Sequence, residues 1–281
     1  MSIQLKVQYR GQIDFDNRED FTLSIIVFTR STPDTAAKVE VDGSGNVTWG
    51  DAATVVNPWD EYALEEGIVQ AKNGGGKASV IAIGGEMHND ALKHSLAMGL
   101  DQAIRVEDDA LDASDALAYA TAASAAVKKV DDAKLVIFGK ESIDVGTDQH
   151  AYMTARKLGW TMLSYVSQII EVDYEAGTIK VEKMYEQGKQ VVTSQLPAVI
   201  TVMKEINEPR YPSFIGIRKA SKAQIPVWSL ADLGISAPTA KTQTLAFNNL
   251  PAREVKTEMI EGEPEEQARI LVDKLLEEKV L

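Results

Sequence analysis

Four short apolar runs, each followed by a segment with helical character, constrain the fold of this chain more than any other feature. The runs are Leu23–Phe28, Ala78–Ile83, Ala103–Val106 and Leu135–Phe138. Continuous apolar runs of this length are typical of strands buried on both faces of a parallel sheet. The alternation of strands with helices therefore predicts an α/β fold with a doubly wound, mostly parallel sheet.

The segments between these runs carry helix start and stop signals. Asn57 and Pro58 predict an N-cap and a first helical residue, and acidic side chains follow in the first turn. A second helix is expected from about Asn89 to Met98, and the alanine-rich stretch Asp112–Lys129 predicts a third. Small side chains on that third helix favour close packing against a sheet.

The pattern changes after Trp160. Three strand-like segments, Met162–Val172, Thr178–Glu186 and Gln190–Ser194, predict an antiparallel meander that extends the same sheet at its edge. The chain becomes irregular from Gly234 and then ends in an amphipathic helix. We therefore expect an N-terminal extension over residues 1–22, a nucleotide-binding α/β domain over 23–236, and a C-terminal arm over 237–281.

The loop after the fourth apolar run has the features of an anion site. Gly139 ends the strand, Lys140–Gln149 is polar, and a helix is expected from about Ala151. The backbone N–H groups before that helix, with the hydroxyls of Ser142 and Thr147, could converge on a phosphate. An ordinary connecting loop is the alternative interpretation of the same residues.

Composition excludes several classes of function. The chain has no cysteine, which excludes disulfides, thiolate nucleophiles and cysteine-ligated metals and suits a reducing cytoplasm. A net charge of −13 argues against a nucleic-acid partner. Apolar runs such as Leu196–Met203 are far shorter than the roughly 20 residues of a membrane span. The N-terminus lacks the apolar core of a signal peptide, so we expect a cytoplasmic protein without membrane insertion.

No catalytic constellation is visible in the sequence. Gly139-Lys140 is not part of a Walker A motif, because Lys134 stands where the first glycine belongs and Glu141 replaces the hydroxyl residue. The three histidines, at positions 88, 94 and 150, lack metal-site spacing, and surface or structural roles are expected for them. These observations favour a protein that binds a nucleotide over an enzyme.

Three segments together resemble the β (small) subunit of electron transfer flavoproteins. They are VVNPWDEYALEEG (Val55–Gly67), GKESIDVGTDQ (Gly139–Gln149), and Leu196–Ser213 with its LPAVITV and NEPRYPS motifs. The resemblance extends from about Leu23 to Leu250. It implies a fold similar to that of adenine-nucleotide α-hydrolases and a heterodimer with a larger α subunit that carries the redox FAD. It also implies an AMP in the β subunit, or a second FAD in the bifurcating members of the family.

The resemblance also assigns residues to the nucleotide site, at strand ends and helix starts. Phe28 departs from the small residue usual at its position. The residues implied are Phe28, Asn57, Pro58, Trp59, Asp60, Gly85, Glu141, Ser142, Ile143, Asp144, Val145, Gly146, Thr147, Asp148 and Gln149.

A partner-recognition loop is implied in the same way. Its expected partners are acyl-CoA dehydrogenase-type flavoenzymes, with electrons passing on to a quinone oxidoreductase. Phe214 takes the place of an apolar anchor, and the alternative is that it packs beneath the prolines. The residues implied are Asn207, Glu208, Pro209, Arg210, Tyr211 and Phe214.

Two questions stay open at this point. AMP is favoured over a second FAD, because the bulky His150 and Tyr152 and the acidic Asp144 and Asp148 flank the place where a diphosphate would turn. A stand-alone ATP- or AMP-binding stress-type protein is the alternative from another functional class. The long C-terminal arm argues for the electron-transfer subunit, because a stand-alone module has little use for it.

Overall fold

The computed structural model describes residues 23–251 and 257–280, which fall into two compact units. The first unit runs to Val39 and continues over Trp49–Leu245, and the second consists of Glu40–Thr48 and the chain from Ala246 on. The N-terminal extension predicted over residues 1–22 lies outside the described residues. No helix in the described parts combines the length and the apolar character needed to cross a bilayer.

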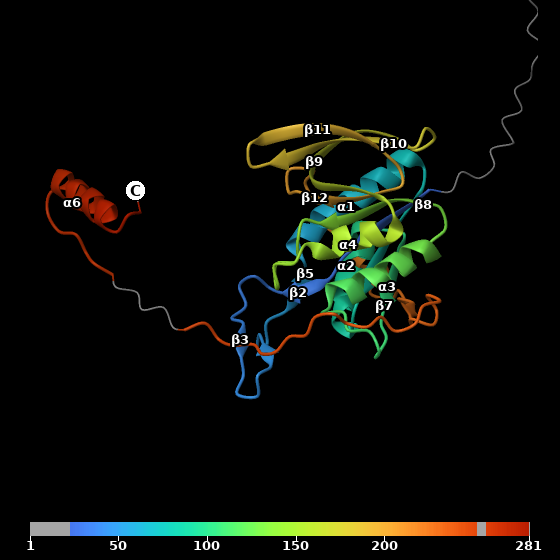
Figure 1. The fold of residues 1–281 in the computed structure, drawn as a ribbon, viewed down its shortest axis with the longest axis horizontal. Coiled ribbons are helices and arrows are strands. Elements are labelled where there is room, and N and C mark those ends of the chain that lie inside the picture. The colour runs from blue at the N-terminus through green and yellow to red at the C-terminus, as the bar shows by residue number, and fades with distance from the viewer. Residues whose placement is uncertain (1–22, 252–256, 281) are drawn as a thin grey trace, which may run out of the picture. The chain divides into compact units, whose positions relative to one another are not determined.

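A nine-stranded sheet forms the centre of the first unit (Figure 1). Neighbouring strands are parallel along the spatial order β9, β12, β8, β1, β6, β7 and β13. At the other edge β10 pairs antiparallel with both β9 and β11. The mostly parallel sheet and its antiparallel extension are therefore confirmed. In spatial order the strands are β11 (Gly188–Gln195), β10 (Thr178–Tyr185), β9 (Thr161–Asp173), β12 (Ala198–Val202), β8 (Ala133–Gly139), β1 (Ser24–Phe28), β6 (Lys77–Ile83), β7 (Gln102–Val106) and β13 (Val227–Trp228).

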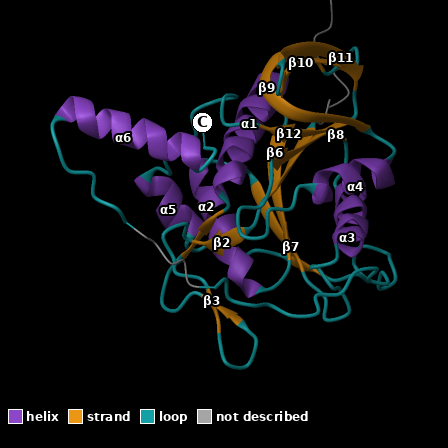
Figure 2. Ribbon diagram, turned by 60° about the vertical axis from the view of Figure 1, so that its left-hand side comes forward, coloured by secondary structure: helices purple, strands orange, loops and turns teal. Residues whose placement is uncertain are grey.

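Helices cover both faces of this sheet (Figure 2). On one side lie α1 (Pro58–Gly74), α2 (Asn89–Met98) and α5 (Phe214–Ala220), and on the other lie α3 (Ala116–Lys129) and α4 (Gln149–Leu158). Successive side chains of a strand point to opposite faces. Ile25 and Val27 of β1 accordingly pack in the apolar layer with α1 and α2, and Ile26 and Phe28 pack in the layer with α3 and α4.

Short elements complete the first unit. β2 (Ser31–Pro33) pairs with β5 (Thr54–Val56), and a 3₁₀ turn, Glu86–His88, leads into α2. Neither strand was predicted, because three residues are too few to show periodicity. Thr242 and Lys241, at the start of the expected arm, donate backbone N–H bonds to the Asp115 carboxylate at the N-cap of α3. The first unit thus continues to Leu245.

The second unit contains a short hairpin and the terminal helix. The hairpin consists of β3 (Glu40–Val41) and β4 (Val47–Thr48), and the Asn249 side chain bonds both backbone groups of Val41. α6 (Pro264–Glu277) begins at a proline, as a helix N-terminus often does. None of its residues is buried.

Candidate functional site

A small cavity lies at the carboxyl ends of β1 and β8, beside the N-termini of α1 and α4. This is where an open α/β sheet normally binds ligands. Of the residues predicted to contact a nucleotide, those that line the cavity are Phe28, Asn57, Asp60, Glu141, Ser142, Thr147 and Asp148. Thr29, Arg30, Tyr119, Phe138, His150 and Ala151 complete the lining. Pro58, Trp59, Gly85, Ile143, Asp144, Val145, Gly146 and Gln149 do not line it.

Asn57 ties the start of α1 to the loop after β8. Its Nδ2 donates to Asp60 Oδ1 at 2.9 Å and to the Glu141 carbonyl oxygen at 2.9 Å, and its Oδ1 accepts from the Ile143 N–H at 3.2 Å. Asn57 precedes the helix as predicted, but its side chain makes no capping hydrogen bond. The N-cap prediction was therefore wrong about the role of this side chain, because acceptors and donors of the loop compete for it.

Asp60 forms the buried floor of the cavity. Its Oδ2 accepts from the Arg30 N–H at 3.1 Å, and burial raises the pKa of its carboxyl to about 7 despite these hydrogen bonds. Gly139 permits this close packing, since a Cβ there would lie 2.5 Å from Asp60 Oδ1 and 2.7 Å from the Trp59 carbonyl carbon. The glycine that ends β8 therefore lets the N-terminus of α1 approach the sheet.

The predicted phosphate loop is folded on itself. Ser142 N–H donates to the Thr147 carbonyl at 2.9 Å, and Gly146 N–H donates to the Ser142 carbonyl at 2.8 Å. The Ser142 hydroxyl donates to Asp144 Oδ1, and Asp144 Oδ2 in turn pairs with Arg30 Nη2 at 2.8 Å. Several donors expected to bind a phosphate are thus already bonded within the protein.

Aromatic rings fill the apolar half of the cavity. The Phe28 and Phe138 rings stack with centroids 4.6 Å apart and an interplanar angle of 5°. The Tyr119 and His150 rings stack with centroids 3.9 Å apart and an angle of 17°. Burial lowers the pKa of His150 to about 4, so this ring is neutral at pH 7. Sequence reasoning missed Tyr119, although it is the one aromatic residue in the alanine-rich helix α3.

The space left in the cavity is about 40 Å³. Sites for small molecules and cofactors usually measure roughly 300–1,000 Å³, whereas about 10–15 Å³ of such volume suffices for one water. Among the described residues Arg30 Nε is buried without a hydrogen-bond partner, and a water in this space could serve it. The residues present therefore fit water and do not fit AMP or a second FAD.

His88 packs against the same end of the sheet. Its Nδ1 accepts from the Ser31 N–H at 3.1 Å, and burial, with the nearby positive charge of Arg30, lowers its pKa to about 4. Gly84 has φ +132°, and a Cβ there would lie 2.7 Å from His88 Nε2. The constrained glycine of this turn is therefore Gly84, next to the predicted Gly85.

Replacing His88 by Asn should reduce the loss of stability on acidification. The pKa of this imidazole is about 4 in the fold and about 6.5 in the unfolded chain, so the unfolded chain binds more protons between these values. The stabilisation is complete above pH 6.5 and is lost as the pH falls towards 4. We expect His88→Asn to remove about 2 kcal/mol of the decrease in unfolding free energy between pH 7 and pH 5.

Denaturant unfolding of both proteins at the two pH values measures this difference. Asp60, whose pKa is raised, has the opposite pH dependence, so only the comparison between variant and wild type is informative. His94→Asn is the control, because the His94 side chain is 34% exposed. Equal losses in wild type and His88→Asn would contradict the prediction.

The predicted partner-recognition loop is fixed to α1. Arg210 Nε and Nη2 donate to the two Glu65 carboxylate oxygens, each at 2.7 Å, and Asn207 Nδ2 donates to the Tyr62 carbonyl at 3.1 Å. Burial alone would raise the pKa of Glu65, but hydrogen bonds from Arg210 outweigh it and leave that pKa below its usual value. Phe214 is 83% exposed, so the alternative that it packs beneath the prolines was wrong.

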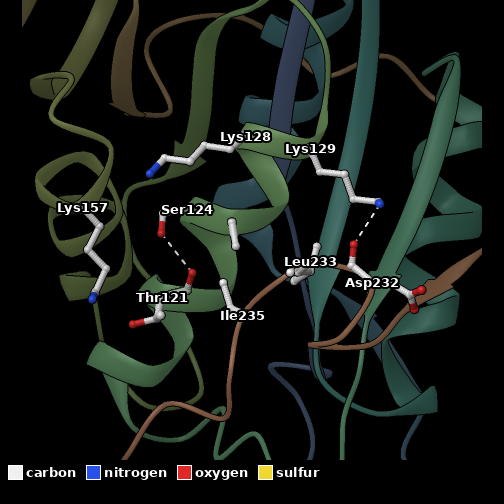
Figure 3. Close-up of a pocket in the computed structure, with 10 residues that line it drawn as sticks. Thr121, Ser124, Lys128, Lys129, Lys157, Asp232, Leu233 and Ile235 are labelled. Atoms are coloured by element: carbon white, nitrogen blue, oxygen red, sulfur yellow. Dashed lines mark hydrogen bonds between the residues drawn. The ribbon is translucent and has the colours of Figure 1, made fainter.

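A second, wider hollow is lined by residues of α3, by Lys157 of α4 and by the segment Asp232–Ile235 (Figure 3). It measures about 570 Å³ and carries Lys128, Lys129 and Lys157. Cations at the ends of helices complement the helix dipoles, which accounts for all three lysines. Lys129 Nζ donates to the Asp232 carbonyl at 2.8 Å, as the dashed line in Figure 3 shows. Nothing in this hollow was predicted from sequence.

Comparisons with known proteins show the family of the chain. Residues 49–233 match the protein family described as Electron transfer flavoprotein domain. The chain is 33% identical to the electron transfer flavoprotein subunit beta of Clostridium acetobutylicum, over 91% of this chain and 99% of that protein. It is 32% identical to the caffeyl-CoA reductase-Etf complex subunit CarD of Acetobacterium woodii, over 92% and 100%. It is 32% identical to protein FixA of Azorhizobium caulinodans, over 76% and 77%.

Proposed function

We propose a specific place in an electron-transfer chain for this protein, from the premise that it belongs to the electron transfer flavoprotein family as a β subunit. Members of this kind carry electrons and are not catalysts on their own. The proposal is that this chain pairs with a larger α subunit that holds the redox FAD. The heterodimer accepts electrons from acyl-CoA dehydrogenase-type flavoenzymes and passes them to a quinone oxidoreductase.

One observation carries the proposal, namely an exposed aromatic side chain on a rigidly held loop. Tyr211 is 95% exposed on this loop, and Phe214, the first residue of α5, is 83% exposed just after it. The bidentate bond between Arg210 and Glu65 fixes the loop. Preorganised aromatic anchors are typical hot spots of protein interfaces. Because redox partners must exchange quickly, a small interface with one dominant anchor suits such an encounter.

The residues around the anchor support the same assignment. Ile215 is 80% exposed beside Phe214, and Ser213 Oγ accepts from the Gly216 N–H at 2.9 Å, which defines the start of α5. A Cβ on Gly216 would lie 2.3 Å from the Ala97 carbonyl oxygen, so α5 packs closely on α2. We assign Asn207, Glu208, Pro209, Arg210, Tyr211 and Phe214 to partner recognition, the first and fourth as positioning residues.

The α subunit's FAD supplies the redox chemistry when it is bound. This chain contributes partner recognition and, we propose, part of the enclosure of that flavin. The sheet with helices on both faces supports a fold of the adenine-nucleotide α-hydrolase type. We assign the chain beyond residue 236, which ends in α6, to docking on the α subunit. The cytoplasmic location stays a prediction.

AMP or a second FAD within this chain is not part of the proposal, because neither fits the cavity of about 40 Å³. The same volume gives no support to a bifurcating subunit with its own FAD. It also gives none to a stand-alone protein that binds ATP or AMP. The electron-carrier role does not depend on what the cavity contains.

Co-purification tests the proposal directly. The chain, produced together with its α subunit, should yield a yellow heterodimer with FAD. Its flavin absorbance should bleach when a catalytic amount of acyl-CoA dehydrogenase and an excess of acyl-CoA are added under anaerobic conditions. A colourless homodimer that binds ATP would refute the assignment. Omitting the dehydrogenase is the control, because acyl-CoA alone should leave the flavin oxidised.

A further inference from the structure

We propose that this chain fills its nucleotide cavity with its own side chains, so that the heterodimer holds the α-subunit FAD and no adenine nucleotide in the β subunit. The rings of Phe28, Tyr119 and His150 occupy the space that a base would need. Arg30 is paired with Asp144 of the loop and is not free to bind a phosphate. This goes beyond the proposed function, which is the same whether the cavity is filled or not.

The first argument is that one face of each ring is already covered by another ring. A protein that binds a base must offer it an open apolar or aromatic face, because stacking contributes about 1–3 kcal/mol per base. In this cavity Phe28 lies on Phe138, and Tyr119 lies on His150. The Phe28 and Tyr119 centroids are 6.4 Å apart, so the two pairs adjoin each other. A purine could enter only by separating rings that are already stacked.

The second argument concerns charge. A phosphate at this loop needs unpaired donors, but both nearby cations are committed. Arg30 pairs with Asp144 at 2.8 Å, and Lys140 pairs with Glu141 at 3.2 Å. The loop carboxylates would repel a phosphate once those pairs were broken, since like charges close together are costly.

The third argument is the polarity of the space that remains. About 40 Å³ is enough for a few water molecules and far below the volume of a nucleotide site. The lining offers water the buried Asp60 carboxyl and Arg30 Nε, which has no partner among the described residues. Water in this small cavity could therefore satisfy the buried polar groups without a ligand.

Nucleotide content of the intact heterodimer is the primary test. The complex is denatured, and the released nucleotides are separated and counted against protein. We expect FAD and no AMP or ADP above background. One AMP, one ADP or a second FAD per heterodimer would overturn the inference. A preparation without FAD would instead overturn the proposed function, so the two failures are distinguishable.

Opening the cavity is the second test. The double variant with Tyr119→Ala and His150→Ala removes one stacked pair, and Val127→Ala, on the same helix but outside the cavity, is the matched control. Engineered cavities of suitable shape take up ligands. Millimolar AMP should raise the melting temperature of the double variant, with binding at least about tenfold tighter than to wild type. Wild type and Val127→Ala should not respond.

Each other outcome counts against the inference. If AMP raises the melting temperature of wild type as much as that of the double variant, the cavity is not closed. If AMP stabilises neither protein, the two rings are not what excludes the nucleotide. Should the double variant fail to fold, the single variant His150→Ala takes its place in the same comparison.

Discussion

Deleting Glu263–Leu281 should weaken the heterodimer by about two to four orders of magnitude in dissociation constant, or about 3–6 kcal/mol. The deleted segment contains α6, in which Leu271 is 49% exposed and Leu276 54% exposed. Burying one such side chain contributes about 1.5–3 kcal/mol. Part of the gain is lost in ordering the helix. The expected sum is therefore smaller than four such contributions, one for each exposed large apolar side chain of the deleted segment, namely Leu271, Val272, Leu276 and Val280.

The need for a partner follows from the properties of α6 itself. It has 14 residues, and none of them is buried. An isolated helix of that length is only marginally stable in water, and helices in proteins gain most of their stability from packing an apolar face. Lys274 does pair with Glu258 at 2.8 Å, but an exposed ion pair contributes little. We therefore expect the apolar stripe of α6 to be covered by the α subunit.

Sedimentation or size-exclusion chromatography over a dilution series measures the assembly. Leu271→Asp combined with Leu276→Asp should reproduce the deletion, whereas Arg269→Ala, at a side chain that is 70% exposed, should assemble like wild type. The deletion should leave the unfolding of the isolated α/β unit unchanged. A truncated chain that still co-purifies at full stoichiometry on dilution would show that α6 is not an assembly element.

Replacing Phe214 by Ala should lower kcat/KM for electron delivery from the partner dehydrogenase by about 5- to 150-fold, which corresponds to about 1–3 kcal/mol. Phe214 is the exposed first residue of α5, and it follows the loop that the bond between Arg210 and Glu65 holds in place. Removing the Phe214 side chain therefore costs the free protein little stability. The lost free energy is that of the encounter with the partner. Because an exposed anchor contributes to the encounter and not to the flavin site, the flavin content and spectrum should stay the same.

Stopped-flow reduction of the flavin at increasing dehydrogenase concentration separates the two effects. The matched control is Ile170→Ala, which removes another exposed apolar side chain, on β9. It should behave like wild type. Normal partner kinetics for Phe214→Ala would remove this residue from the recognition site, and loss of FAD would give it a structural role instead.

The sequence predicted those parts of the molecule that local chemistry controls. Continuous apolar runs predicted the central strands, and the Asn57-Pro58 pair predicted the start of α1, because both signals act within a few residues. The general rule that ligand sites form at the carboxyl ends of parallel strands indicated the loop with Ser142 and Thr147, and the family resemblance added Asn57 and Asp60. All four residues line one cavity, so their proximity was predictable from the sequence.

What the site can hold was decided only by tertiary structure. Phe28, Tyr119 and His150 come from β1, α3 and α4, and nothing local to any of them indicates that their rings meet. Asn57 has the residue type of a helix cap, yet its side chain bonds a loop far along the chain. A local pattern specifies which face of an element is apolar, but the volume left between elements depends on every side chain that converges there. For the same reason the exposure of Phe214 depended on the contacts of its loop with α1, which the sequence alone does not specify.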